Sequence, residues 1–127
     1  MEGFSLRKKI MLVDDSATVL MMERMILNKG PYDLVVARDG QEALEKAPHE
    51  RPDLILLDVM MPRLGGLEAC KRLRELPVTG ATPIIMVTTR GELENIETAF
   101  GNGCNDYVTK PINGVELLTK IRNFLGD

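Results

Sequence analysis

Side chains able to bind a metal or a phosphate group stand at the ends of four short stretches that have the character of β-strands. Asp14 and Asp15 follow the first stretch, Asp58 the second and Thr88 the third, and Lys110 closes the fourth. Carboxylates brought together repel one another, and a hard divalent cation such as Mg²⁺, which prefers oxygen ligands, relieves that repulsion. A hydroxyl and an ammonium beside them would complete a binder for a dianionic tetrahedral group.

Each of these residues also has an ordinary structural interpretation. An aspartate after a strand commonly caps the next helix or turn, and a threonine there commonly belongs to a turn. A lysine is most often a solvated surface charge. Four separate structural explanations would have to hold at four strand ends at the same time. One shared binding site explains all of these residues together, and we therefore favour it.

The stretch that positions Asp58 is residues 54–57, four aliphatic residues lying between Pro52 and Pro62. Such a run is typical of a strand buried on both faces in the middle of a parallel sheet. Ligands of open α/β sheets bind at the carboxyl ends of the strands, where Asp58 stands. Four more strands are predicted, over residues 10–13, 34–37, 83–87 and 106–109. A helical pattern follows each of the five strands.

Five strands alternating with five helices predict a doubly wound α/β fold, with a parallel sheet covered by helices on both faces. No linker, repeat or low-complexity segment interrupts the pattern. We therefore expect a single domain over residues 1–127, with its core at about 8–125.

The first helix should run to about residue 29 and bury Val19, Met22 and Ile26, which recur at helical spacing. Leu20 and Met21 then fall on the other side of that helix. Single exposed apolar residues are common, but these two could also form a docking patch for a partner helix.

Two later helices begin with capping boxes, Asp39 to Glu42 and Asn113 to Glu116. Pro48 should shorten the first of these. Residues at helical intervals form the expected buried sides of the last three helices: Leu67, Cys70, Leu73 and Leu76; Leu93, Ile96, Ala99 and Phe100; Leu117, Leu118, Ile121, Phe124 and Leu125.

The length, net charge and composition of the chain limit the class of protein. The chain has 127 residues, a net charge of −3, and 44% apolar residues, which is typical of a globular domain. It contains neither a basic run nor an apolar run of membrane-spanning length, so we expect no direct nucleic-acid binding, no membrane association and a cytoplasmic location. Cys70 and Cys104 lack metal-type spacing and should be buried, reduced thiols.

Four motifs in this order resemble the receiver domain of bacterial two-component response regulators, and are similar to the single-domain chemotaxis regulators within that family. The resemblance extends from about Lys9 to Leu125. The motifs that carry it are Leu12-Val13-Asp14-Asp15-Ser16, Leu57-Asp58-Val59-Met60-Met61-Pro62, Val87-Thr88-Thr89 and Asp106-Tyr107-Val108-Thr109-Lys110-Pro111.

The resemblance implies the flavodoxin-like strand order 2-1-3-4-5 and a phosphoacceptor signalling domain rather than an enzyme. Asp58 would accept a phosphoryl group from a sensor histidine kinase or a phosphotransfer protein and later lose it, both steps being self-catalysed. Asp15, Asp58 and the backbone carbonyl of Met60 would hold Mg²⁺, and Asp14 would contact it through water.

The resemblance also assigns the remaining matched residues. Lys110 would pair with the phosphoryl group, Thr88 would swing toward it, and Tyr107 would turn into the space that Thr88 leaves. The surface of the fourth helix, fifth strand and fifth helix would change and bind a protein target that the sequence does not name. The bond between Lys110 and Pro111 would be cis.

Two departures from the family pattern lie near the site. Gly65 stands where the family often has Asp before the third helix, and glycine is a comparable or slightly weaker cap. Thr89 follows the switch threonine where a smaller residue is frequent. We expect its branched side chain to restrict the access of water and slow the loss of the phosphoryl group.

Three other function classes stay open. A Mg²⁺-dependent phosphohydrolase could use the same aspartyl-phosphate chemistry, although its nucleophile would be expected after the first strand. A flavin or nucleotide binder would need a glycine-rich loop after that strand, which is missing. A degenerate receiver would act only as a binding module. The chain itself could be a stand-alone regulator or relay, or a piece of a larger protein.

Overall fold

The computed structural model describes residues 7–89 and 96–126 of the chain. Strands and helices alternate along it, as the sequence predicted. The elements are β1 (Lys8–Val13), α1 (Ala17–Leu27), β2 (Tyr32–Ala37), α2 (Gly40–Glu50), β3 (Leu54–Asp58), α3 (Gly66–Glu75), β4 (Ile84–Thr89), α4 (Ile96–Gly101), β5 (Asp106–Lys110) and α5 (Gly114–Leu125).

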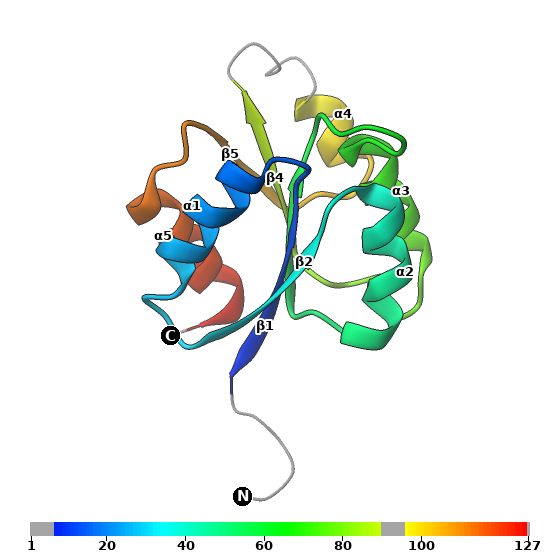
Figure 1. Ribbon diagram of the computed structural model, residues 1–127. Coiled ribbons are helices and arrows are strands. Elements are labelled where there is room, and N and C mark those ends of the chain that lie inside the picture. Colours follow the sequence, from blue (N-terminus) through cyan, green and yellow to red (C-terminus); the bar gives the residue numbers. More distant parts are fainter. Residues whose placement is uncertain (1–6, 90–95, 127) are drawn as a thin grey trace, which may run out of the picture.

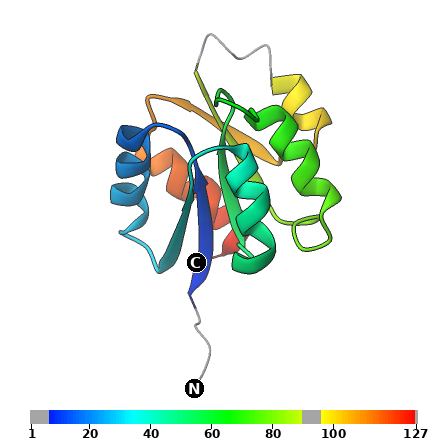
Figure 2. The same cartoon turned by 45° about the vertical axis from the view of Figure 1, so that its right-hand side comes forward.

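The five strands form one parallel sheet in the order β2-β1-β3-β4-β5. Helices α1 and α5 cover one face, and α2, α3 and α4 cover the other (Figure 1). Turning the molecule shows the same three layers from a second side (Figure 2). The doubly wound fold and the strand order 2-1-3-4-5 are therefore confirmed.

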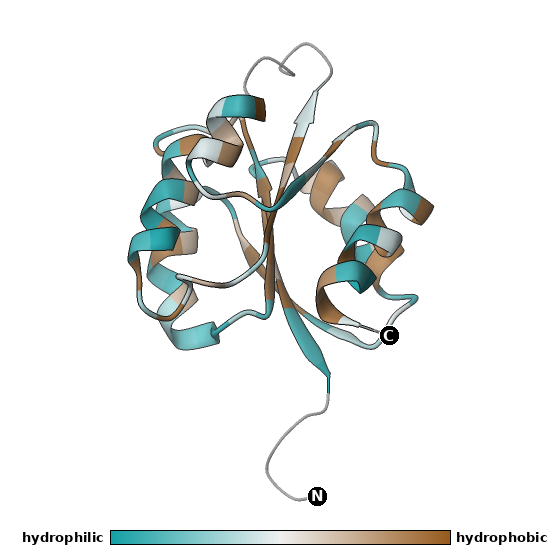
Figure 3. Ribbon diagram, turned by 180° about the vertical axis from the view of Figure 1, so that it is seen from behind, coloured by the Kyte–Doolittle hydropathy of each residue, from teal (hydrophilic) through white to brown (hydrophobic). Residues whose placement is uncertain are grey.

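Alternate residues of the central strands supply the two halves of the core. Met11, Val13, Ile55 and Leu57 pack under α2 and α3, whereas Ile10, Leu12, Leu54 and Leu56 pack under α1 and α5. Every residue of β3 is buried, because helices cover both faces of a central parallel strand. Apolar residues accordingly gather along the sheet, while the outer helix surfaces are largely hydrophilic (Figure 3).

The buried side of α1 differs from the predicted one. Leu20, Glu23 and Leu27 face the core, whereas Met22 is 39% exposed and Met21 is 56% exposed. The predicted set and the observed set lie next to each other on the helix surface. The observed set was not recognised in the sequence because the charged residue Glu23 interrupts its apolar pattern. Leu20 is a core residue, so it cannot belong to an exposed docking patch.

Helix α2 is not shortened by Pro48. It continues past this residue to Glu50, and it ends only at Arg51, whose φ of 48° is left-handed. Ala43 and Ala47 are fully buried against the sheet. Their packing holds the helix together although the proline lacks the backbone N–H that would complete the hydrogen-bond ladder.

The other helices follow the predictions in most respects. Asp39 and Asn113 cap α2 and α5 by accepting the backbone N–H groups of Glu42 and Glu116. Phe100 and Phe124 are more exposed than predicted, at 45% and 36%. The predicted contribution of Leu93 lies outside the described residues. Both cysteines are buried, free thiols, as expected. Among the described residues no helix is long and apolar enough to cross a membrane.

Candidate functional site

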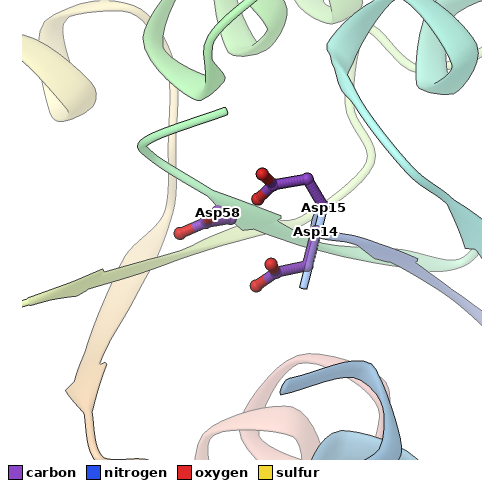
Figure 4. Close-up of side chains that lie close together, drawn as sticks. All are labelled: Asp14, Asp15 and Asp58. Atoms are coloured by element: carbon purple, nitrogen blue, oxygen red, sulfur yellow. The ribbon is translucent and has the colours of Figure 1, made fainter. Parts of the chain in front are cut away.

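The carboxyl ends of β1 and β3 bring three aspartates together. Asp58 is the last residue of β3, and Asp14 and Asp15 follow β1 directly. An oxygen from each of the three carboxylates lies within 4.8 Å of the other two. Figure 4 shows the three side chains pointing to the same side of the sheet edge. The structure thus assembles the acidic cluster that the sequence predicted.

The three carboxylates differ in their surroundings. Asp14 and Asp58 are buried, with 1% and 4% exposure, whereas Asp15 is exposed. Asp14 Oδ1 accepts the backbone N–H of Ser16 at 2.9 Å. Asp14 Oδ2 is buried without a hydrogen-bond donor. A buried carboxylate oxygen with no donor is costly in free energy, and it is a suitable ligand for a cation or for a water held by one.

Lys110 supplies the positive charge of the cluster from the end of β5. Its Nζ lies 3.1 Å from Asp58 Oδ1 and 3.6 Å from Asp14 Oδ2. Burial alone would lower the pKa of the ammonium. The hydrogen bond to Asp58, with the charges of Asp58, Asp14 and Glu23, outweighs burial and raises that pKa above its ordinary value. Lys110 therefore stays protonated between the aspartates.

Burial raises the pKa of both buried aspartates, and the negative charges of neighbouring aspartates add to it. Burial is the larger cause for Asp58, followed by the negative charge of Asp14, and together they raise its pKa to about 6. Burial also raises the pKa of Asp14, although the backbone N–H of Ser16 and the charge of Lys110 oppose that shift. One lysine does not compensate the cluster, and a divalent cation would supply the missing charge.

Thr88 and Thr89 end β4, the neighbour of β3 in the sheet. Thr88 is buried, and its hydroxyl donates to the backbone carbonyl of Thr89 at 3.3 Å. Thr89 is exposed at the edge of the sheet. The strand register places Thr88 one residue beyond Val87, the partner of Asp58. The hydroxyl is therefore on the strand next to the cluster, but it is engaged with its own backbone.

The loop between β3 and α3 ends under a tight steric constraint at Gly66, the first residue of α3. A Cβ atom at Gly66 would lie 2.1 Å from the backbone carbonyl oxygen of Asp58, so only glycine fits there. The backbone N–H of Gly66 donates to the carbonyl of Val59 at 2.9 Å. Gly65 is the N-cap of α3 and makes no side-chain cap. The side chain of Met60 is 64% exposed, and the metal-binding role of its carbonyl stays a prediction.

Tyr107 lies on β5, two strands away from Asp58 in the sheet, and it precedes Val108, whose partner Val87 is also the partner of Asp58. Its ring meets that of Phe100 edge to face, with centroids 6.4 Å apart, and Lys120 Nζ is 5.1 Å from its centre. The side chain is half-buried among α4, β5 and α5. The Lys110–Pro111 peptide bond is cis, as the resemblance implied.

Glu23 is a site neighbour that the sequence analysis missed. It lies on the buried side of α1, is 1% exposed, and is within electrostatic range of Asp14, Asp58 and Lys110. Burial, and then the charge of Asp14, raise its pKa to about 8. The spacing from Leu20 and to Leu27 could have revealed it, because those residues recur on one helical side.

The sequence profile of the response regulator receiver domain matches residues 10–122. The chain belongs to this family, and it is a receiver domain of a two-component signalling system. Receiver domains are signalling domains. The family membership agrees with the parallel sheet and with the acidic cluster at its carboxyl edge.

Curated relatives include two regulators of Bacillus subtilis. The alkaline phosphatase synthesis transcriptional regulatory protein PhoP is 39% identical over 94% of this chain and 49% of its own length. The transcriptional regulatory protein ResD is 40% identical over 92% of this chain and 48% of its own length. The chain thus spans about half the length of the curated relatives it matches.

Solved structures extend the comparison. The chemotaxis protein CheY4 of Vibrio cholerae has a TM-score of 0.87 and 34% identity, over 93% of this chain and 98% of its own. The receiver domain of the sensor histidine kinase PA1611 from Pseudomonas aeruginosa has a TM-score of 0.87 and 28% identity, over 95% of this chain and 99% of its own. That receiver has a magnesium ion coordinated in its active-site cleft.

Proposed function

We propose that Asp58 is the phosphoacceptor of this receiver domain and that it takes its phosphoryl group from a phosphohistidine of a sensor histidine kinase or a phosphotransfer protein. An oxygen of the Asp58 carboxylate forms a bond to phosphorus while the phosphorus–nitrogen bond of the phosphohistidine breaks. The electron pair of that bond leaves with the imidazole. The product is an aspartyl phosphate, which water later hydrolyses to restore Asp58.

The observation that carries this proposal is the position of Lys110 among the aspartates. Its Nζ lies 3.1 Å from Asp58 Oδ1. The ammonium can therefore stay next to the carboxylate when a phosphoryl group is attached to it. Phosphoryl transfer depends mainly on positioning and on neutralising the charge of the phosphoryl oxygens. An ammonium beside the nucleophile supplies part of that charge.

We infer that Asp15, Asp58 and the backbone carbonyl of Met60 hold Mg²⁺, and that Asp14 contacts it through water. The fit rests on the oxygen donors within 4.8 Å of one another and on the buried Asp14 Oδ2 without a donor. When bound, Mg²⁺ supplies charge neutralisation to the carboxylates and to the phosphoryl oxygens.

Phosphorylation of Asp58 would change the surface of the domain through movements of Thr88 and Tyr107. An aspartyl phosphate adds a charge of about −1.5 to −2 and new acceptor oxygens, which can draw the Thr88 hydroxyl from the carbonyl of Thr89. Tyr107 would then turn inward and leave its contacts with Phe100 and Lys120, and so change the surface of α4, β5 and α5. We expect that surface to bind a protein target.

The wider setting is also a proposal. We expect residues 1–127 to form one receiver unit with its core at about 8–125, located in the cytoplasm, and to be a signalling domain rather than an enzyme that turns over a substrate. The regulators PhoP and ResD carry transcriptional functions in their names. For this chain we propose protein binding as the output and no direct contact with nucleic acid or membrane.

The test is the intact mass of the protein after incubation with acetyl phosphate and Mg²⁺, alongside an Asp58→Asn variant. One added phosphoryl group that needs both the metal and Asp58 is the expected result. Labelling that persists in Asp58→Asn would contradict the assignment. Absence of labelling at any metal concentration would favour a degenerate receiver that acts by binding alone, and steady release of phosphate would favour a hydrolase.

A further inference from the structure

The loop between β3 and α3 follows Asp58 directly and carries Met60, whose backbone carbonyl belongs to the proposed Mg²⁺ site. The two ends of this loop are joined, because the backbone N–H of Gly66 donates to the carbonyl of Val59 at 2.9 Å. The side chain of Met60 is exposed, so its packing contributes little to holding the loop. The position of the Met60 carbonyl therefore depends on contacts made elsewhere in the loop.

Residues 37–40, which lead from β2 into α2, supply such contacts. The backbone N–H of Gly40 donates to the carbonyl of Leu64 at 3.2 Å. A Cβ atom at Gly40 would lie 2.5 Å from that carbonyl oxygen, so the close approach of the two backbones requires glycine. Asp39 Oδ2 accepts a hydrogen bond from Nη2 of Arg63 and forms an ion pair with it. Two successive residues of the β2–α2 segment thus hold two successive residues of the loop.

The ion pair between Asp39 and Arg63 differs from an ordinary surface pair in two ways. The side chain of Asp39 is 6% exposed, although that of Arg63 is 70% exposed, so solvent screens this pair less than a pair in which both partners are solvated. Arg63 has a φ of 63°, a left-handed conformation that an arginine rarely adopts. The ion pair therefore stabilises a loop conformation that the backbone of Arg63 by itself disfavours.

The same segment also contacts the end of β1. The carbonyl of Ala37 accepts the backbone N–H of Asp14 at 3.1 Å. Asp39 Oδ1 accepts the backbone N–H of Glu42 at 2.8 Å and so caps α2. Residues 37–40 are thus fixed to a helix and touch two chain segments, the one that carries Asp14 and the loop after β3. Both segments supply oxygen atoms to the proposed metal site.

We propose that Asp39 and Arg63 are positioning residues for the metal site: their ion pair holds the β3–α3 loop against the start of α2 and so keeps the Met60 carbonyl in place. This inference rests on the proposed function, in which that carbonyl is a ligand of Mg²⁺. A loop that already has its binding conformation loses less free energy on binding than a loop that must first be ordered. The ion pair should therefore strengthen Mg²⁺ binding.

Positioning and simple electrostatics predict opposite signs for the loss of Arg63. Removal of a positive charge would by itself strengthen the binding of a cation. Arg63→Asn removes the guanidinium and introduces a residue that tolerates a positive φ. We expect the dissociation constant of Mg²⁺ to rise roughly fivefold, because the loop then has its binding conformation for a smaller fraction of the time. Arg38→Asn, which removes an exposed arginine next to Asp39, is the matched control and should bind within about twofold of the wild type.

Two further variants separate the ion pair from the helix cap. Asp39→Asn keeps an oxygen for the N–H of Glu42, because asparagine is as good an N-cap as aspartate, but it loses the charge that binds Arg63. It should weaken Mg²⁺ binding about as much as Arg63→Asn does. The double variant should be little weaker than either single variant, as expected when two residues act through one contact. Arg63→Lys retains a positive charge and should restore binding to within about twofold of the wild type.

Hydrogen exchange of the metal-free protein, followed by NMR, tests the contact independently of binding. The Gly40 N–H donates to the loop, whereas the Asp14 N–H donates to Ala37 at the other end of the same segment. In Arg63→Asn the Gly40 amide should exchange several-fold faster and the Asp14 amide at the wild-type rate, because local opening of the loop exposes only the first. Equal acceleration of both amides, or of neither, would overturn the inference.

Calorimetric titration of Mg²⁺ into the wild type and the variants closes the test. Weaker binding in Arg63→Asn together with unchanged binding in Arg38→Asn supports positioning, whereas equal or tighter binding in Arg63→Asn would overturn it. Wild-type protein that binds no Mg²⁺ would overturn the proposed metal site, and the inference with it. Failure of the phosphoacceptor assignment is distinguishable, since it appears as labelling of Asp58→Asn by acetyl phosphate.

Discussion

Lys110 Nζ lies 3.1 Å from Asp58 Oδ1, and the two groups share a site with 4% exposure at the aspartate. The pair is nevertheless not balanced, because burial and the charge of Asp14 raise the pKa of Asp58 to about 6 despite the lysine. The ammonium therefore orients the Asp58 carboxylate without fully compensating its charge. The stability of the metal-free protein should reflect this imbalance.

Asp58→Asn should stabilise the metal-free protein at neutral pH. The folded state holds the Asp58 proton more tightly than the unfolded chain, whose ordinary pKa is 3.8, so wild-type stability from this group is lost as the pH rises from 3.8 through about 6. At pH 7 the variant should gain on the order of 2 kcal/mol, and the gain should disappear near pH 4. Urea denaturation in EDTA across this range measures it.

Asp33→Asn is the matched control, because the Asp33 side chain is 46% exposed and pairs with Arg7 at the opposite end of the sheet. It should change the free energy of unfolding by less than about 0.5 kcal/mol at any pH in the series. A gain for Asp58→Asn that is the same at pH 4 and pH 7 would show that repulsion is not its source.

Mg²⁺ should stabilise the wild-type protein. A ligand that binds only the folded state raises its stability in proportion to the logarithm of ligand concentration, by about 2.7 kcal/mol at a hundred times the dissociation constant. Wild-type protein should therefore gain melting temperature as Mg²⁺ is added, and Asp15→Asn should lose most of that gain. Glu68→Gln changes an exposed carboxylate on α3 that pairs with Arg72, and it should respond like the wild type. An equal Mg²⁺ response in Asp15→Asn would remove Asp15 from the metal site.

The fold was predictable because its signals are local. Runs such as residues 54–57 have the length and the aliphatic composition of central strands, and the capping residues Asp39 and Asn113 begin their helices as predicted. The alternation of elements indicated a parallel sheet but left its strand order open. That order came from the family resemblance, since strand neighbours are set by long-range packing that spacing alone does not record.

The site was predictable only where motifs mark strand ends. Asp14, Asp58 and Lys110 could be placed together because parallel strands end at one edge. Glu23 could not, because its place under the cluster depends on how α1 is rotated against the sheet. Leu20 was misplaced for the same reason: its stripe and the neighbouring one differ by a single helical step, and tertiary packing selects between them.

The corrected orientation of α1 makes a direct prediction about stability. Leu20 is 4% exposed in the core between α1, α5 and the sheet, so Leu20→Ala should destabilise the protein by about 2–4 kcal/mol. Met21 is the next residue and is 56% exposed, so Met21→Ala should cost less than about 0.5 kcal/mol. Chemical denaturation of the two variants side by side makes the comparison. Equal losses in the two variants would contradict a core position for Leu20 and an exposed position for Met21.

Thr89→Ala should shorten the lifetime of the phosphoryl group on Asp58. Thr89 is the exposed last residue of β4, next to the buried Thr88. We expect water to approach an aspartyl phosphate on Asp58 from this end of the strand. Its branched side chain restricts that approach, and a methyl group would restrict it less, so the loss of phosphate should be several-fold faster, the scale of about 1 kcal/mol in a barrier. Decay of the added mass after removal of acetyl phosphate measures the rate. Thr82→Ala, before the start of β4, is the control and should decay like the wild type. An unchanged rate in Thr89→Ala would show that Thr89 does not limit the access of water.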